Sequence, residues 1–138
     1  MYRAKIEDLI KWKNSPDRKP LILRGVRQVG KTWLMKEFGE KYYEKCAYIN
    51  FDSNDRMTQV FKEDFDIGRI IQSLKIESGV NIEPENTLII FDEVQETPQA
   101  LTALKYFYEN ANEYHIMAAG SLLRCCNARW YIIPSWQS

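Results

Sequence analysis

Eight residues near the start of the chain, Gly25 to Thr32, read "GVRQVGKT" and match the pattern G-x-x-x-x-G-K-[ST] at every defined position. The apolar segment "PLILR" precedes them, and a segment with Leu34, Met35 and Phe38 at helical spacing follows. A strand, a glycine-containing loop and a helix in this order form a P-loop, in which backbone N–H groups and the helix N-terminus face a phosphate chain. The motif therefore restricts this part of the chain to a strand, loop and helix unit of an α/β fold.

Beyond this motif, the hydrophobic spacing alternates between strand-like and helix-like, with no internal repeat and no low-complexity stretch. We predict strands in four apolar segments, residues 20–25, 46–52, 87–93 and 115–121. We predict helical structure around residues 6–10, in residues 30–43, within residues 56–79, and from Pro98 onward. Strands that alternate with helices require right-handed crossovers and give a mainly parallel sheet covered on both faces. The sequence therefore predicts a three-layer α/β fold of the P-loop NTPase type.

Length, charge and cysteine spacing argue against a multidomain, secreted, membrane-bound or disulfide-rich protein. The 138 residues fit one domain, and nineteen basic side chains balance nineteen acidic ones, so no net field favours nucleic acid or an anionic membrane. The apolar runs are strand-sized, and the start of the chain lacks the apolar block of a secretory signal. Cys46 stands alone and Cys125 adjoins Cys126, which is neither a disulfide framework nor a metal-binding spacing. We expect a cytoplasmic protein with reduced thiols and no membrane partner.

The P-loop predicts a nucleotide site for ATP with Mg²⁺. Its residues are Gly25, Val26, Arg27, Gln28, Val29, Gly30, Lys31, Thr32 and Trp33. Lys31 is expected to reach the β- and γ-phosphates as a point charge, and the Thr32 hydroxyl is expected to ligate Mg²⁺. Arg27 and Gln28 contact phosphate or a neighbouring subunit in this interpretation, although a solvated loop tip explains them about as well.

Two acidic residues, Asp92 and Glu93, end the apolar run "LIIF". A carboxylate at the C-terminal end of a buried strand emerges beside the P-loop, so Asp92 is expected to hold Mg²⁺ through water, as a Walker B aspartate does. Glu93 points to the other side of the strand end and is predicted to polarise a water for attack on the γ-phosphate. The alternative is a pair of solvated acids at the start of a loop.

The segment "HIMAAGS" contributes one further candidate. Ser121 emerges between the P-loop and the acidic pair if this strand lies between theirs, and it can then touch the γ-phosphate or the attacking water. An ordinary turn at Gly120 and Ser121 is the alternative. His115 begins the same strand, and we expect it at the surface or at an edge.

With these residues in place, the chain resembles the archaeal and bacterial AAA-type ATPases that carry a C-terminal domain of uncharacterised function. The resemblance rests on "KPLILRGVRQVGKTWLMKEFG", "YINFD", "LIIFDEVQETPQALTALKYFYE" and "AAGSLL", which span most of residues 18–123. It implies a five-stranded sheet of order 5-1-4-3-2, hydrolysis of ATP with Mg²⁺ to ADP and phosphate, and a sensor role for Ser121. It gives no substrate.

The last fifteen residues, Arg124 to Ser138, depart from the family pattern, in which "GSLL" continues into a stretch like "GVAL…SFPVGKV". Tryptophan has the single codon TGG, so reading one base later turns Trp130 and Trp136 into glycines. Permitted codons then allow the whole tail to be rewritten as "GVAMQDGTSFPVGKV". We interpret residues 1–123 as a truncated AAA-like ATPase domain and residues 124–138 as a non-native, frameshifted tail. The alternative is a native short protein with an amphipathic, tryptophan-anchored tail.

This interpretation has functional consequences. Without a fifth strand and a C-terminal domain, the first strand exposes an edge that can associate with a second copy. Without an arginine finger from the missing part, turnover by this chain is expected to be weak. We favour an ATPase core that is coupled in the full-length parent to an unknown protein or nucleic-acid partner. A nucleotide-gated binding module and a P-loop small-molecule kinase are the alternatives.

The coding DNA tests the frameshift directly. We expect that moving the reading frame after Leu123 opens a long, family-like extension that begins with the glycine-containing stretch. A shifted frame that closes at once, or that encodes no such extension, would show that the tail is native.

Overall fold

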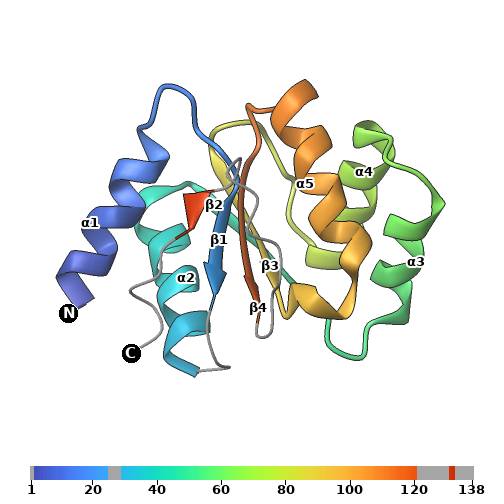
Figure 1. Cartoon of the computed structure of the whole chain (residues 1–138), viewed down its shortest axis with the longest axis horizontal. Helices are drawn as coiled ribbons and strands as arrows, with labels where there is room; N and C mark the ends of the chain where they lie inside the picture. Colours follow the sequence, from blue (N-terminus) through green and yellow to red (C-terminus); the bar gives the residue numbers. More distant parts are fainter. Residues whose placement is uncertain (1, 25–28, 121–130, 133–138) are drawn as a thin grey trace.

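The computed structural model describes residues 2–24, 29–120 and 131–132. In chain order the elements are α1 (Tyr2–Lys13), β1 (Leu21–Arg24), α2 (Val29–Tyr42), β2 (Lys45–Asn50), α3 (Asp55–Glu63), α4 (Ile67–Ser78), β3 (Thr87–Asp92), the 3-10 helix η1 (Val94–Glu96), α5 (Pro98–Asn110), β4 (His115–Gly120) and β5 (Tyr131–Ile132). Strands occupy the centre of the molecule, with helices on either side (Figure 1). Within the described ranges, no helix is long and apolar enough to cross a membrane.

The strands form one sheet of order β2-β3-β4-β1-β5, in which every neighbouring pair is parallel. Read from the other edge, this is the order 5-1-4-3-2 that the family resemblance implied, so that prediction is confirmed. β4 is a late strand in the sequence, yet it lies between β1 and β3. Because of this insertion, the strand that leads into the P-loop and the strand that ends in the acidic pair become second neighbours.

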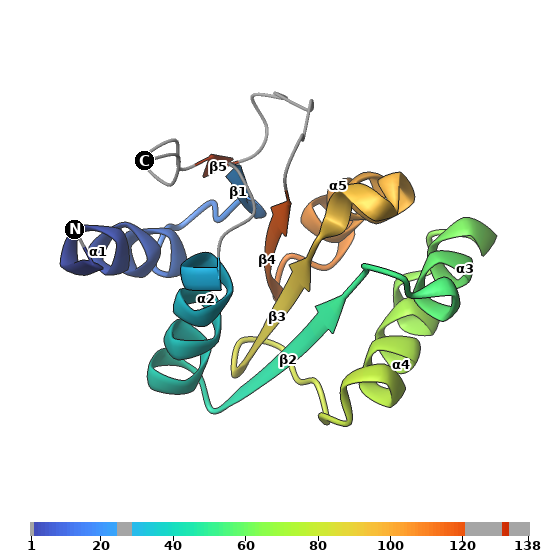
Figure 2. The ribbon, with the colours of Figure 1, turned by 90° about the horizontal axis from the view of Figure 1, so that it is seen from below.

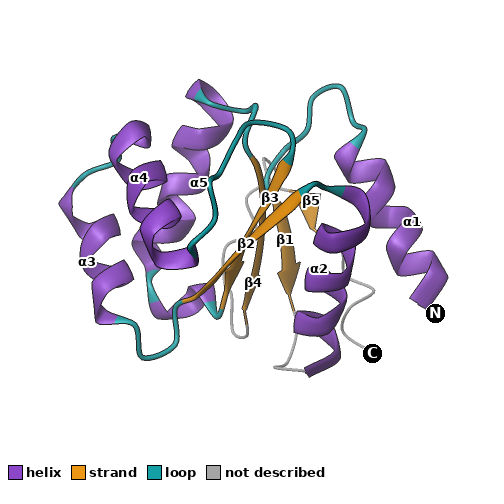
Figure 3. Cartoon of the chain, turned by 180° about the vertical axis from the view of Figure 1, so that it is seen from behind, coloured by secondary structure: helices purple, strands orange, loops and turns teal. Residues whose placement is uncertain are grey.

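Helices cover both faces of the sheet, as predicted. On one face, residues of α1 and α2 share a core cluster with Leu88 and Ile90 of β3, and on the other face residues of α3, α4 and α5 share a cluster with Ile89 and Phe91. Figure 2 shows the two helical layers from below, and Figure 3 shows them from behind. All six residues of β3 are buried, which explains why this strand is apolar almost throughout rather than alternating.

We expected no fifth strand, and this expectation is wrong. β5 pairs in parallel with β1 through Leu21 with Tyr131 and Ile22 with Ile132. Its two residues belong to the segment that we interpret as a frameshifted tail. Backbone pairing uses N–H and C=O groups that nearly every residue carries, so a strand this short demands little of its sequence. Among the described residues, β5 pairs with the first half of β1, so at least this part of the edge is not open as expected.

The region with helical spacing between residues 56 and 79 divides into two helices, α3 and α4. The side chain of Asn54 caps the start of α3, and the Asp66 carboxylate accepts a hydrogen bond of 2.9 Å from the backbone N–H of Arg69 at the start of α4. These caps satisfy N–H groups that a helix start leaves unpaired. Gly79, at φ 72°, ends α4 in the left-handed conformation that glycine adopts without steric cost.

His115 is buried, with 5% of its surface exposed, which corrects the expected surface or edge position. The Tyr43 hydroxyl lies 2.6 Å from its Nδ1, and the Trp12 ring contacts the imidazole edge-on at a centroid distance of 6.1 Å. Trp12 of α1 and Tyr43, the residue after α2, therefore cover the first residue of β4. Burial, followed by the nearby positive charges of Arg18 and Lys13, lowers the pKa of His115 to about 4.

This shift makes stability depend on pH in a defined window. Because the pKa of His115 falls from 6.5 to about 4 on folding, the unfolded chain binds the extra proton between these values, and stability decreases as the pH falls through them. The contribution lost between pH 7 and pH 5 is about 2 kcal/mol. Urea unfolding of the wild type and of His115→Gln at both pH values measures it. We expect a smaller loss in the variant, and equal losses would contradict this assignment.

Candidate functional site

The candidate site lies where the carboxyl ends of β1, β3 and β4 meet. The last residue of β1, Arg24, is in register with Gly120, the last residue of β4, and β3 ends at Asp92. α2 begins at the same edge (Figure 1). In open α/β sheets, ligands bind at this edge, where side chains and helix N-termini converge.

Asp92 is the centre of this arrangement. Its side chain is buried, with 3% of the residue exposed, and its Oδ2 atom accepts a hydrogen bond of 2.7 Å from the Thr32 hydroxyl. The other oxygen, Oδ1, accepts a hydrogen bond of 2.9 Å from the backbone N–H of Glu93. The structure thus brings together Thr32 and Asp92, the two residues that the sequence predicted as Mg²⁺ ligands.

Tyr48 is a member of the site that the sequence analysis missed. Its hydroxyl donates a hydrogen bond of 2.6 Å to Oδ2 of Asp92, the same oxygen that Thr32 contacts. The ammonium group of Lys36 lies 4.0 Å from the centre of the Tyr48 ring. Burial, and then the hydrogen bond to Asp92, raise the pKa of Tyr48 well above its ordinary value, so the phenol keeps its proton at neutral pH.

A weak sequence signal for Tyr48 exists in the strand alternation. Ala47 and Ile49 belong to the core under α3, α4 and α5, so Tyr48 points to the opposite face, where α2 lies. Tyr48 pairs with Ile90, two residues before Asp92. A long polar side chain at that position reaches the end of the neighbouring strand.

Glu93 adopts a backbone conformation that is uncommon for its residue type. With φ 54° and ψ 41° it lies in the left-handed region, which is unfavourable for residues with a Cβ atom. Its Oε1 atom accepts a hydrogen bond of 2.7 Å from Nε2 of Gln95, in the short helix η1. Unfavourable backbone conformations of this kind are concentrated at functional sites.

The remaining predicted site residues are described only in part. Val29, Gly30 and Lys31 lie in the first turn of α2, and the side chains of Val29 and Lys31 are outside the described part of the chain. Trp33, also in that turn, has 54% of its surface exposed. The other predicted members lie outside the described residues, namely Gly25, Val26, Arg27, Gln28 and Ser121.

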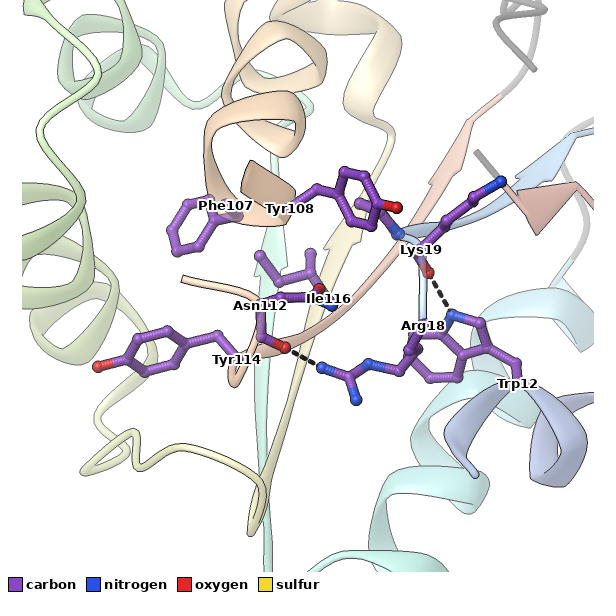
Figure 4. A pocket seen from close by; sticks show the side chains of 9 residues that line it. Trp12, Arg18, Lys19, Phe107, Tyr108, Asn112, Tyr114 and Ile116 are labelled. Carbon is purple, nitrogen blue, oxygen red and sulfur yellow. Dashed lines mark hydrogen bonds between the residues drawn. The ribbon is translucent and has the colours of Figure 1, made fainter. Parts of the chain in front are cut away.

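A small cavity lies at the opposite, amino end of the strands, and it does not suit a ligand. Figure 4 shows Arg18, Lys19 and Trp12 on one side of it and residues of α5 and β4 on the other. The Trp12 indole N–H donates to the Lys19 carbonyl, and the Arg18 guanidinium donates to the Asn112 carbonyl. The cavity measures about 10 Å³, which is the space of a single water molecule.

The chemistry of the Thr32 and Asp92 pair fits a hydrated Mg²⁺ ion. Both supply oxygen atoms, the ligand type that this ion prefers, and both lie beside the first turn of α2. Among the residues that the structure describes, no group of three or more histidine, cysteine, aspartate or glutamate side chains could hold a metal ion. Mg²⁺ is commonly bound by one or two protein groups together with water and substrate phosphates, rather than by an all-protein cage.

Comparison with solved structures finds chains of similar fold. The chain is similar to one in a structure of Drosophila ORC bound to AT-rich DNA and Cdc6, with a TM-score of 0.53 and 12% identity, over 88% of this chain and 46% of that one. It is also similar to C. elegans PCH-2, with a TM-score of 0.46 and 17% identity, over 96% of this chain and 39% of that one. The chain therefore spans less than half the length of either protein.

A family model gives the more direct assignment. Among curated proteins no sequence matches. A model described as an AAA domain matches residues 17–128, a range that covers most of the chain and contains the P-loop, Asp92 and Glu93. The chain belongs to the AAA domain family and has the α/β fold of an AAA-type P-loop ATPase.

Proposed function

We propose that the chain binds ATP with Mg²⁺ at the carboxyl edge of the sheet and hydrolyses it to ADP and phosphate. The observation that carries this proposal is the 2.7 Å contact between Thr32, which ends the P-loop motif, and Asp92, which ends β3. Sixty positions separate these residues in the sequence, and both are of the type that an Mg²⁺ site requires. Membership in the AAA domain family supports the same function.

In this proposal, the backbone N–H groups of residues 25–33 and the N-terminus of α2 bind the phosphates. Lys31 neutralises oxygens of the β- and γ-phosphates, and Arg27 and Gln28 contact phosphate from within the loop. Thr32, and Asp92 through water, hold Mg²⁺, which neutralises charge on the phosphate oxygens when it is bound. Tyr48 keeps the Asp92 carboxylate in place.

Glu93 acts as the general base in the proposed reaction. Water attacks the γ-phosphorus, a bond forms between the water oxygen and phosphorus, and the bond from the γ-phosphorus to the bridging oxygen of ADP breaks. The proton of the attacking water moves to the Glu93 carboxylate. Ser121 contacts the γ-phosphate or the attacking water.

We further propose that hydrolysis drives a protein or nucleic-acid partner in the full-length protein, and that this chain alone turns over slowly. The ORC structure contains DNA and Cdc6, but a sequence identity of 12% supports only a similar fold and does not indicate a similar partner. Self-association through the edge of the sheet at β1 belongs to the same proposal.

Binding is the first test. Calorimetry with ATP and Mg²⁺ should show binding to the wild type and at least about a tenfold weaker affinity for Lys31→Ala, because a point charge on the phosphates is lost. Lys41→Ala, in the last turn of the same helix, is the control and should bind as the wild type does. Equal affinities of all three proteins would exclude the P-loop as the binding site.

Hydrolysis is tested separately from binding. Glu93→Gln should retain ATP affinity and lower the hydrolysis rate by about 10² to 10⁴-fold, the usual contribution of a general base. Glu96→Gln, an exposed carboxylate three residues away, is the matched control. Unchanged phosphate release by Glu93→Gln would remove this residue from the reaction and favour a nucleotide-gated binding module.

Tyr48→Phe tests the support of the metal-holding carboxylate. Loss of the hydroxyl leaves Asp92 with one donor fewer at Oδ2, and the affinity for Mg²⁺ in the presence of ATP should fall by about 10 to 100-fold. Binding of ATP in the presence of a chelator should not change. Tyr106→Phe, on a ring that stacks on Phe65 in the opposite layer, is the control. An equal loss with and without Mg²⁺ would indicate a general structural defect instead.

A further inference from the structure

Gln95 connects the ends of two neighbouring strands through its side chain. It lies in η1, directly after β3, and its Nε2 atom donates a hydrogen bond of 2.7 Å to Oε1 of Glu93. Its other terminal atom, Oε1, is buried and has no hydrogen-bond partner among the described residues. Buried polar side-chain atoms usually have a partner, so this amide has an unusual position.

The oxygen lies against Gly120, the last residue of β4, in a position that we call the seat of the Gln95 amide. A Cβ atom added to Gly120 would lie 2.3 Å from Oε1 of Gln95, which is far closer than two such atoms can approach. It would also lie 3.3 Å from the Gln95 backbone nitrogen and 3.4 Å from Cγ1 of Val94, distances that small shifts can accommodate. The absence of a side chain at Gly120 is therefore what allows the Gln95 amide to occupy this position.

The orientation of the amide follows from its neighbours. A carboxylate oxygen only accepts hydrogen bonds, so the NH₂ group of Gln95 must face Glu93 and the carbonyl oxygen must face Gly120. The left-handed backbone of Glu93 fixes the start of the same side chain. Glu93 is thus held at its backbone by the turn and at its carboxylate by Gln95.

We infer that Gln95 is a positioning residue for Glu93 and that Gly120 provides its seat. This inference rests on the proposed function, in which Glu93 is the general base. The amide holds one carboxylate oxygen in a fixed place, so that the carboxylate faces the attacking water in a constant orientation. Displacing a catalytic group by about 1 Å can lower the reaction rate by about 10²-fold, so a contact that fixes the position of Glu93 is expected to affect the rate of hydrolysis.

Kinetics of ATP hydrolysis test this role. Gln95→Met keeps the length of the side chain and removes the donor. It should lower kcat by about 10 to 100-fold and leave KM for ATP with Mg²⁺ within about twofold, because only the reacting geometry changes. Gln99→Met is the matched control, since the amide oxygen of Gln99 is also buried and has no hydrogen-bond partner in the part of the chain that the structure describes. An unchanged kcat in Gln95→Met overturns the inference, and a raised kcat would show instead that Gln95 restrains Glu93.

Gly120→Ala tests the seat independently, because a methyl group there displaces the Gln95 side chain without touching Glu93. It should lower kcat as Gln95→Met does, and the double variant should be no slower than either single variant. Additive losses would show that Gly120 acts separately from Gln95. Thermal melts identify any variant that fails to fold.

Two further measurements separate failure of this inference from failure of the proposed function. A wild type that does not hydrolyse ATP, or an unaffected Glu93→Gln, overturns the function and the catalytic role of Gln95 together. NMR of the side-chain amide groups tests the contact without any hydrolysis. The Gln95 NH₂ resonances, identified by their loss in Gln95→Met, should move in Glu93→Ala and in Gly120→Ala, while those of Gln99 stay in place. Resonances that do not move overturn the contact itself.

Discussion

The buried carboxylate of Asp92 is the group on which the arrangement of the site depends. A carboxylate removed from water is costly unless hydrogen bonds replace its hydration. Here Thr32 and Tyr48 donate to one oxygen and the backbone N–H of Glu93 donates to the other. These donors come from α2, from β2 and from the turn after β3. Satisfying one side chain therefore sets the relative positions of three elements at the edge where the P-loop motif leads into its helix.

The position of β4 has a related consequence for how the site forms. β1 pairs with β4, and β4 pairs with β3, so the strand before the P-loop reaches the strand of Asp92 only through residues 115–120. These contacts join segments that are distant in sequence, and such contacts are costly in chain entropy until most of the sheet is present. The carboxyl edge is thus a product of the complete four-stranded core, and no local segment of the chain can build it alone.

The sequence was sufficient for features that follow from local pattern and from the family resemblance. These include the strand order, the two helical layers and the meeting of Thr32 with Asp92.

The sequence was insufficient where side chains reach across strands. Tyr48 looks like an ordinary strand residue until β2 is placed beside β3, and Gln95 looks like a turn residue until Gly120 is brought next to it. His115 was misjudged for the same reason, because α1 and Tyr43 cover it from outside its own strand. The pairing of Tyr131–Ile132 with β1 could not be predicted from the sequence, because a two-residue strand held by backbone hydrogen bonds requires no hydrophobic pattern.

The two acidic side chains of the site are held from opposite directions. Asp92 is held from the side of β2 and α2, through Tyr48 and Thr32, whereas Glu93 is held from the side of β4, through Gln95 seated on Gly120. The residues are adjacent in sequence, yet the left-handed turn at Glu93 separates their side chains and gives each its own neighbours. The contacts described for the two carboxylates therefore come from different strands, and the backbone N–H of Glu93, which donates to Asp92, links them. Under the proposed function, changes at Tyr48 or Thr32 are expected to act on metal binding, and changes at Gln95 or Gly120 are expected to act on hydrolysis.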